Sequence, residues 1–302
     1  MILEFPQTTT VEINKALVDT RKEGGVVTLG RVMTLVIDAT DADHEHAIAT
    51  ANVASKEHPC RIIVIAPRDA KEDRLDAQIR VGGDAGASEV VVLRPSGAMV
   101  DHHDTLVAPL LLPDTPIVAW WPAHVPSVVT ETSIGHMAQR RITDTKGDVV
   151  PADSLRMLAE RYRPGDTDLA WTRLTRWRAL LASALEQVKD QRVTLARVHG
   201  DTNSPSILLF GAWLRHALGC EFEATYDDKV TGLQHVILET PAGNISINRP
   251  DGFNATIEQP GQPSHVIALP ARTLNECLAE ELRRMDDDRV YGEVLAAYAA
   301  QG

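Results

Sequence analysis

The chain has 302 residues, 44% of them hydrophobic, so it can bury a substantial core as one large domain or two ordinary ones. Its formal net charge of −12 disfavours nucleic acid as a partner, because acidic proteins repel phosphate backbones unless basic residues gather on one face. Its apolar runs are far shorter than the roughly 18 residues of a membrane span, and no secretory signal follows Met1, so we expect no membrane contact and a cytoplasmic location.

The first half of the chain alternates helical and strand patterns. A capping-box pattern from Thr9 to Glu12 begins a predicted helix that runs to about Lys22. Continuous aliphatic runs predict strands buried on both faces, alternating apolar residues predict a further strand at 77–81, and stretches with helical spacing separate the strands. The predicted strands are 32–37, 61–65, 77–81, 89–94 and 116–121, and the predicted helices between them are 41–57 and 99–112. The gap between 77–81 and 89–94 is too short for a helical crossover, so we expect an antiparallel insertion there.

The second half begins with a predicted helix at 152–161 and a turn at Arg163 to Asp166. Asp166 is interpreted as the N-cap of a long helix that runs to about Val188, with Asp168 in its first turn. The remaining predicted strands are 193–198, 222–226, 235–239, 244–248, 255–258 and 265–269, and the remaining predicted helices are 205–218, 274–284 and 290–298.

These elements predict two domains. Helices that alternate with buried strands indicate an α/β N-terminal domain, 1–164, in which helices flank a mostly parallel sheet. Strands grouped between helices indicate an α+β C-terminal domain, 165–302, with antiparallel strands, and we place the boundary near Gly165.

The motifs that could carry catalysis fail on their local context. The glycine-rich loop from Gly82 to Ala87 precedes a strand, whereas a phosphate-binding loop precedes a helix, so we interpret it as a connection with unusual backbone angles. His44 and His46 lie two residues apart on a predicted helix and therefore point away from each other. The Gly-x-Ser-x-Gly pattern of serine hydrolases is absent from the sequence. We therefore expect no catalytic residues, cofactor-binding residues or metal ligands.

Aromatic and arginine residues are the better candidates for binding a partner. Trp120 and Trp121 close a predicted parallel strand, and the carboxyl ends of such strands form the usual ligand crevice. Successive side chains of a strand point to opposite faces, so at most one of the two indoles can reach a surface, and both being structural is equally consistent. Arg140 and Arg141 could present a positive patch to an acidic partner or a sugar phosphate, or be a solvated pair.

A second candidate surface lies on the predicted long helix. Trp171 and Arg178 are seven residues apart and therefore lie on one side of that helix. Ala170, Leu174 and Leu181 already supply a core stripe, so this second stripe is a candidate contact surface.

Several strings of the sequence together resemble those of one known family. They are Gly30-Arg31-Val32-Met33-Thr34-Leu35, Glu57-His58-Pro59, Leu75-Asp76-Ala77-Gln78, Val118-Ala119-Trp120-Trp121-Pro122, Arg140-Arg141-Ile142-Thr143-Asp144, Gly165-Asp166-Thr167-Asp168-Leu169-Ala170-Trp171 and Glu276-Cys277-Leu278-Ala279-Glu280-Glu281-Leu282-Arg283-Arg284. In these strings the chain resembles the glucose-6-phosphate dehydrogenase assembly proteins called OpcA, of the actinobacterial type. The resemblance is densest before residue 180.

This resemblance implies a non-catalytic protein partner of glucose-6-phosphate dehydrogenase, in a hetero-oligomer that supports NADPH production by the pentose phosphate pathway. It implies no chemistry and no cofactor of the chain's own. The alternative reading is a sensor that binds a small molecule or nucleotide in the crevice near Trp121.

Overall fold

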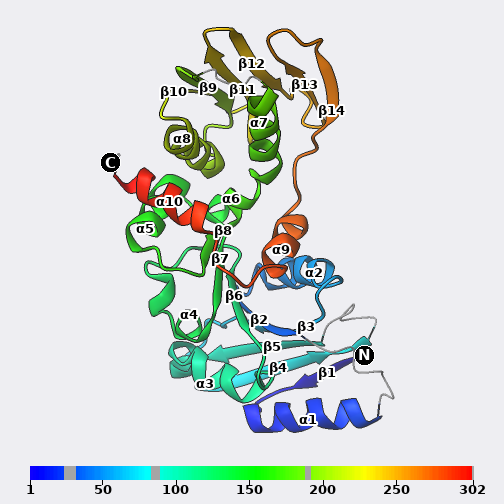
Figure 1. Cartoon of the computed structure of the whole chain (residues 1–302). Helices are drawn as coiled ribbons and strands as arrows, with labels where there is room; N and C mark the ends of the chain where they lie inside the picture. Colours follow the sequence, from blue (N-terminus) through cyan, green and yellow to red (C-terminus); the bar gives the residue numbers. More distant parts are fainter. Residues whose placement is uncertain (24–31, 83–88, 188–191, 301–302) are drawn as a thin grey trace. The chain divides into compact units, whose positions relative to one another are not determined.

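The aliphatic runs of the N-terminal half form the centre of a sheet in the computed structural model, which describes residues 1–23, 32–82, 89–187 and 192–300. The chain divides into two units that interleave in sequence (Figure 1). Unit 1 is Met1–Asp144, Arg163–Thr167 and Leu274–Asp287, and unit 2 is Thr145–Tyr162, Asp168–Thr273 and Asp288–Gly302. Gly165 thus lies in a short segment that returns to unit 1.

In the described part of unit 1, eight strands form one sheet with the order β1-β4-β5-β3-β2-β6-β7-β8. The strands are β1 Ile2–Phe5, β2 Met33–Asp38, β3 Cys60–Ile65, β4 Arg74–Arg80, β5 Glu89–Ser96, β6 Ile117–Trp121, β7 Arg140–Thr143 and β8 Asp166–Asp168. The run β5-β3-β2-β6-β7 is parallel. The predicted antiparallel insertion is confirmed, because β4 pairs antiparallel with β5 and with β1.

Helices cover both faces of this sheet, as the sequence predicts for an α/β domain. They are α1 Thr10–Glu23, α2 His44–Ala54, α3 His103–Val107, α4 Ser133–Met137 and α9 Leu274–Leu282. Figure 1 shows α1 on one side of the sheet and α2 beside α9 on the other. The capping box of α1 is confirmed, because the Thr9 amide donates to Glu12 Oε2 at 3.0 Å and the Glu12 amide donates to Thr9 Oγ1 at 3.3 Å.

The single helix predicted over 99–112 is wrong. The chain forms a 3₁₀ helix at Gly97–Asp101, then α3, then a second 3₁₀ helix at Ala108–Leu110. His102 leaves helical geometry with φ −122° and ψ 47°, and Pro109 cannot donate the backbone hydrogen bond that an α-helix needs. A further 3₁₀ turn lies at Val129–Glu131.

In the described part of unit 2, six strands form a sheet with the order β10-β9-β11-β12-β13-β14. They are β9 Leu195–Gly200, β10 Glu221–Tyr226, β11 Leu233–Thr240, β12 Gly243–Asn248, β13 Asn254–Glu258 and β14 His265–Ala268. Only β9 and β10 pair in parallel among these strands, and α8 Pro205–Leu218 connects them. The other pairings are antiparallel, as the sequence predicts for this half.

The remaining helices of unit 2 are α5 Pro151–Arg161, α6 Leu169–Thr172, α7 Thr175–Gln187 and α10 Arg289–Ala299, after a 3₁₀ turn at Thr145–Gly147. Side chains of α7, α8, α10 and one face of the sheet form one hydrophobic cluster, which includes Trp177, Phe210, Val236 and Val294. Across the described ranges of both units, no helix combines the length and the apolar character that a membrane crossing requires.

The predicted long helix from Asp166 to Val188 is wrong in its first part. Asp166 lies in β8, and Asp168 is the N-cap, with φ −126° and ψ 137°. The chain interrupts the helix at Arg173 and Leu174 before α7 begins. The short strands β1, β7 and β8, of three or four residues each, carry no periodicity that sequence analysis could use.

Asp168 holds the start of α6 and the start of unit 2 together. Its side chain is fully buried and accepts hydrogen bonds from the Ala170 amide at 2.8 Å, the Thr145 amide at 2.9 Å and the Thr145 hydroxyl at 2.9 Å. A buried carboxylate satisfied by several donors is expensive to remove, because the donors then lose their only partners.

We expect Asp168→Ala to lower the free energy of unfolding by about 2–4 kcal/mol, since it leaves buried N–H and O–H donors without an acceptor. Urea denaturation followed by circular dichroism measures this loss. The exposed Asp228→Ala is the matched control and should change stability by less than about 0.5 kcal/mol. Equal stability of the two variants would contradict the role assigned to Asp168.

Two histidines face each other on neighbouring strands of unit 2. His235 of β11 lies opposite His199 of β9 in the strand register. Burial, with a further contribution from His199, lowers the pKa of His235. The unfolded chain therefore binds a proton at a higher pH than the folded chain, and stability falls as the pH drops below the ordinary histidine value of about 6.5.

We expect His235→Gln to reduce the loss of stability between about pH 7 and about pH 5, because the variant has no proton to take up on unfolding at this position. Denaturation midpoints at a series of pH values measure the slope. His124→Gln, at an exposed position in unit 1, should leave the slope unchanged. The same slope in the wild type and in His235→Gln would refute the assignment.

Candidate functional site

The carboxyl ends of β2 and β6 lie where an α/β sheet usually binds its ligand. Chain progress along the parallel strands reverses between these two strands, which creates a topological switch point. Asp38 ends β2 and Trp121 ends β6. The Trp121 indole N–H donates to Asp38 Oδ2 at 3.1 Å, and both Trp120 and Trp121 are fully buried. Neither indole therefore offers a surface to a ligand or a partner in this structure.

The loop after β2 has the wrong chemistry for a dinucleotide. A dinucleotide site needs glycines there, so that backbone amides can approach a pyrophosphate. This loop instead carries Asp38, Asp41 and Asp43 before α2 begins. His103 Nδ1 lies 3.9 Å from Asp38 Oδ2, which is too far for a hydrogen bond. The switch point is thus acidic and would repel a phosphate.

The other sequence motifs add no chemistry that the structure supports. Gly82 has φ +71°, the left-handed geometry expected of a glycine connection, whereas residues 83–87 of that loop lie outside the described residues. Among the described residues, no group of three or more His, Cys, Asp or Glu side chains could hold a metal ion.

Arg140 and Arg141 make internal ion pairs in unit 1. Arg140 is 1% exposed, and its guanidinium donates to Glu281 of α9. Arg141 is 8% exposed; its guanidinium donates to Asp166, and it also reaches the carbonyls of Ala138 and Pro164 at 2.7 and 2.6 Å. Burial is the main cause that raises the pKa of the Asp166 carboxyl. These two arginines join β7 to α9 and to segment 163–167 and present little charge to solvent.

Trp171 and Arg178 meet in unit 2 as their spacing predicts, although the helix between them is interrupted. The Arg178 guanidinium carbon lies 3.6 Å from the centre of the Trp171 ring, a close cation–π contact. Trp171 is 1% exposed, and its indole N–H donates to Asp288 Oδ2 at 2.8 Å. Arg178 is only partly buried, so it is the most accessible of the six residues predicted to bind a partner.

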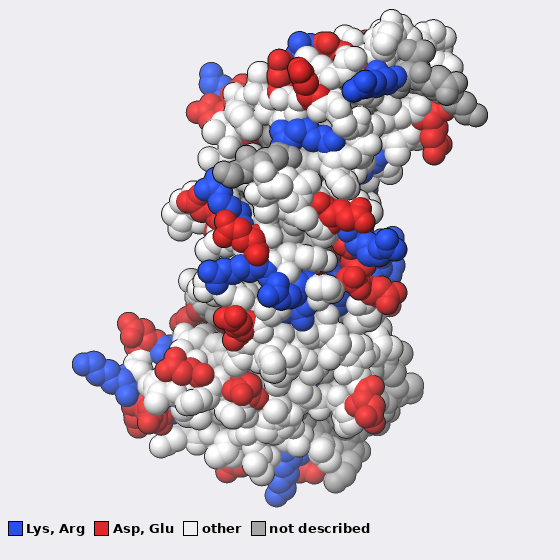
Figure 2. Space-filling view, turned by 60° about the vertical axis from the view of Figure 1, so that its left-hand side comes forward, with Lys and Arg blue, Asp and Glu red and all other residues white. Residues whose placement is uncertain are grey.

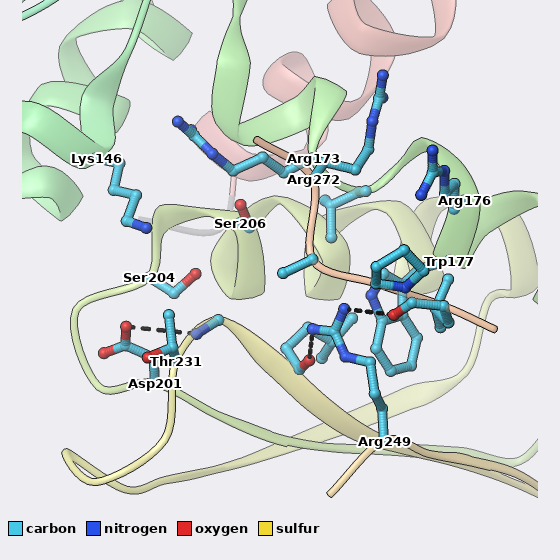
Figure 3. A pocket seen from close by; sticks show the side chains of 16 residues that line it. Lys146, Arg173, Arg176, Trp177, Asp201, Ser204, Ser206, Thr231, Arg249 and Arg272 are labelled. Atoms are coloured by element: carbon cyan, nitrogen blue, oxygen red, sulfur yellow. Dashed lines mark hydrogen bonds between the residues drawn. The ribbon is translucent and has the colours of Figure 1, made fainter. Parts of the chain in front are cut away.

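Unit 2 contains a pocket that sequence analysis did not predict (Figure 3). Its volume is about 80 Å³, which is room for several water molecules, since one needs about 10–15 Å³. We call it the cationic pocket, because its lining includes five basic side chains, Lys146, Arg173, Arg176, Arg249 and Arg272, and only one acidic side chain, Asp201. This excess stands out in a chain with net charge −12.

The basic residues reach the pocket from separate segments. Figure 3 shows Lys146 pointing toward Ser204 on one side, and Arg249 beside Trp177 on the other. The Arg249 guanidinium carbon lies 5.1 Å from the centre of the Trp177 ring. Arg272 donates to the carbonyl of Thr172, the last residue of α6, at 2.8 Å. The pocket thus combines charge with an aromatic wall.

The sequence carries little warning of this pocket. Arg173 and Arg176 stand out beside Trp171 and Trp177, and that interleaving is the one local signal. Lys146, Arg249 and Arg272 are spread over more than a hundred residues and join the pocket only through the fold of unit 2. Elsewhere the charges are mixed: on the face shown in Figure 2, basic and acidic side chains stand next to one another.

The solved structures that the chain matches include oxidoreductases, at very low sequence identity. A 3-ketoreductase from Actinomadura kijaniata is 10% identical with a TM-score of 0.49, over 88% of this chain and 95% of that chain. A myo-inositol dehydrogenase from Corynebacterium glutamicum is 10% identical with a TM-score of 0.42, over 89% and 95%. A likeness at this level supports no conclusion about function.

Curated relatives and family models agree with each other. The putative OxPP cycle protein OpcA of Nostoc punctiforme is 26% identical over 58% of this chain and 43% of the relative, and that of Synechococcus elongatus is 28% identical over 60% and 44%. The matched region thus spans less than half the length of these relatives. The N-terminal domain model of the glucose-6-phosphate dehydrogenase subunit matches residues 51–161, and its C-terminal domain model matches residues 164–295. The chain therefore belongs to the OpcA family of glucose-6-phosphate dehydrogenase assembly proteins.

Proposed function

We propose that this protein is a non-catalytic partner of glucose-6-phosphate dehydrogenase that supports assembly and activity of that enzyme, and thereby NADPH production. The observation that carries the proposal is the match of both halves of the chain to domains of a glucose-6-phosphate dehydrogenase subunit. The partner of this chain would be a protein, and the functional unit a hetero-oligomer.

The chemistry of unit 1 supports a role without catalysis. Its strand order creates a switch point, yet Asp38, Asp41 and Asp43 occupy the loop where a nucleotide-binding sheet needs glycines. Trp121 is fully buried against Asp38, so the crevice that a sensor would use is filled by the protein's own side chain. The usual ligand site of such a sheet therefore lacks the glycines that a nucleotide needs.

A partner of this kind acts through differential binding. It can raise the activity of an enzyme only by binding the active or assembled state better than the inactive state. Such coupling is typically about 1–3 kcal/mol, enough for a 5- to 150-fold shift. The contact surface of this protein should therefore fit the active or assembled state of the enzyme better than the inactive state.

The direct test combines copurification with an activity assay. Expressed together with the dehydrogenase of the same organism, the protein should coelute with it in size-exclusion chromatography and raise its specific activity. The dehydrogenase alone and the dehydrogenase with an unrelated acidic protein are the controls. Separate elution together with unchanged specific activity would overturn the proposal.

Two variants separate contact residues from core residues. Arg178→Ala should weaken complex formation by about tenfold, as loss of a partly exposed charged contact does, while lowering the melting temperature only slightly. Trp121→Phe should lower the melting temperature, because it removes the indole N–H donor to Asp38 and leaves a void, without changing the affinity of the folded protein.

Isothermal titration calorimetry measures the affinity for the dehydrogenase, and differential scanning calorimetry measures the melting temperature. The exposed Arg161→Ala in α5 is the control for charge loss. An unchanged affinity in Arg178→Ala, with a large drop in melting temperature, would assign Arg178 to the core as the cover of Trp171.

A further inference from the structure

Arg249 is a buried cation whose partners are neutral. It is 6% exposed, and its two terminal nitrogens donate to the carbonyls of Leu269 at 3.0 Å and Leu233 at 2.6 Å. Its Nε is buried and has no hydrogen-bond partner among the described residues. Burial lowers the pKa of this arginine, because the charged form loses water. A buried charge normally has an oppositely charged partner, and here none is in contact among the described residues.

Two acidic residues close to Arg249 or in the pocket lining, Asp251 and Asp201, accept hydrogen bonds from backbone amides. Asp251 accepts hydrogen bonds from the Phe253 amide at 2.8 Å and the Asn254 amide at 2.7 Å. Asp201, the acid in the pocket lining, accepts from the Asn203 amide at 3.0 Å and the Gly232 amide at 3.5 Å. Both carboxylates stabilise turns, and among the described residues neither forms a hydrogen bond or an ion pair with Arg249. Asp251 is close enough to oppose the lowering of the pKa of Arg249.

A helix terminus adds to this positive field. Ser204 and Ser206 line the pocket, and they flank the N-terminus of the 14-residue α8. Ser204 occupies the N-cap position, but its side chain makes no capping hydrogen bond. The first amides of a helix carry partial positive charge and are well placed to bind an anion.

We propose that the cationic pocket binds the phosphate group of a small organic phosphate. Arg249 supplies the buried charge, Lys146, Arg173 and Arg176 supply the charge at the rim, and the N-terminus of α8 supplies the positive end of a helix dipole. Trp177, Leu269 and Pro270 line the same pocket and offer an apolar wall to the organic part of the ligand. The inference rests on unit 2 alone and does not depend on the partner proposed above.

Size and charge select this class of ligand. The pocket, with a volume of about 80 Å³, has room for a small anion. Five basic side chains against one acidic side chain favour a dianion over a monocarboxylate, because the attraction grows with the charge of the ligand. Arginine can bind phosphate with paired N–H donors, so the pocket should bind phosphate more tightly than chloride.

The test uses inorganic phosphate and glycerol 3-phosphate as probes, in isothermal titration and thermal-shift measurements on the full chain without any dehydrogenase. Saturable binding and a rise in melting temperature are expected with both probes, and neither with sodium chloride at the same ionic strength. Absence of saturable binding by both probes would overturn the proposal, as would an equal thermal shift with chloride.

Substitutions at the rim of the cationic pocket test whether the phosphate binds there. Lys146→Gln and Arg176→Gln change exposed side chains and should each weaken binding about tenfold while the protein stays folded. Arg161→Gln and Arg192→Gln remove exposed charges outside the pocket lining and should bind both probes like the wild type. If the rim variants bind as tightly as the wild type, the phosphate lies elsewhere and the pocket assignment is wrong.

Discussion

A charge taken out of water needs compensation inside the protein, and this constraint organises unit 1. In unit 1, Arg61 lies within a parallel sheet and is paired with Glu89 of the neighbouring strand at 2.7 Å. Arg140 and Arg141 satisfy the same requirement through Glu281 and Asp166. Breaking such a pair by removing one partner costs several kcal/mol, about 3–5, because the other charge stays buried. These pairs therefore fix which segments must lie side by side within the unit.

The same constraint explains which predictions from sequence succeed. Strands β2, β3, β5 and β6 are recognised because an aliphatic run needs no distant information to be buried. Helix α8 is recognised to the residue, since Pro205 and Gly219 mark its two ends. In contrast, Asp168 caps α6 with help from Thr145, 23 residues earlier, and local spacing cannot reveal such a partner. Local spacing therefore predicts Asp166 as the N-cap, whereas the helix begins after Asp168.

Arginines expose the limit of local reasoning most clearly. Arg140, Arg141 and Arg178 look alike in sequence, as charged residues beside aromatic or aliphatic ones. Their environments differ because a carboxylate, or an indole ring, arrives from elsewhere in the fold. Two tryptophans follow the same logic, since the buried indole N–H groups of Trp121 and Trp171 donate to Asp38 and Asp288, which lie far away in sequence. The residue type predicts that the side chain needs a partner, and the topology of the fold determines which residue is that partner.

The contrast between the two units bears on how a partner protein of this family could work. Unit 1 has a topological switch point between β2 and β6, and aspartates and the buried indole of Trp121 lie there. Unit 2 leaves Arg249 with carbonyl partners only, in a pocket rich in cations. The buried cation that we propose binds a phosphate thus belongs to unit 2 and not to the parallel sheet of unit 1, whose switch point is the usual ligand site of such folds. If a phosphate occupies that pocket, its binding free energy adds to the stability of unit 2 alone, which gives the chain a means of sensing a metabolite without any catalytic step.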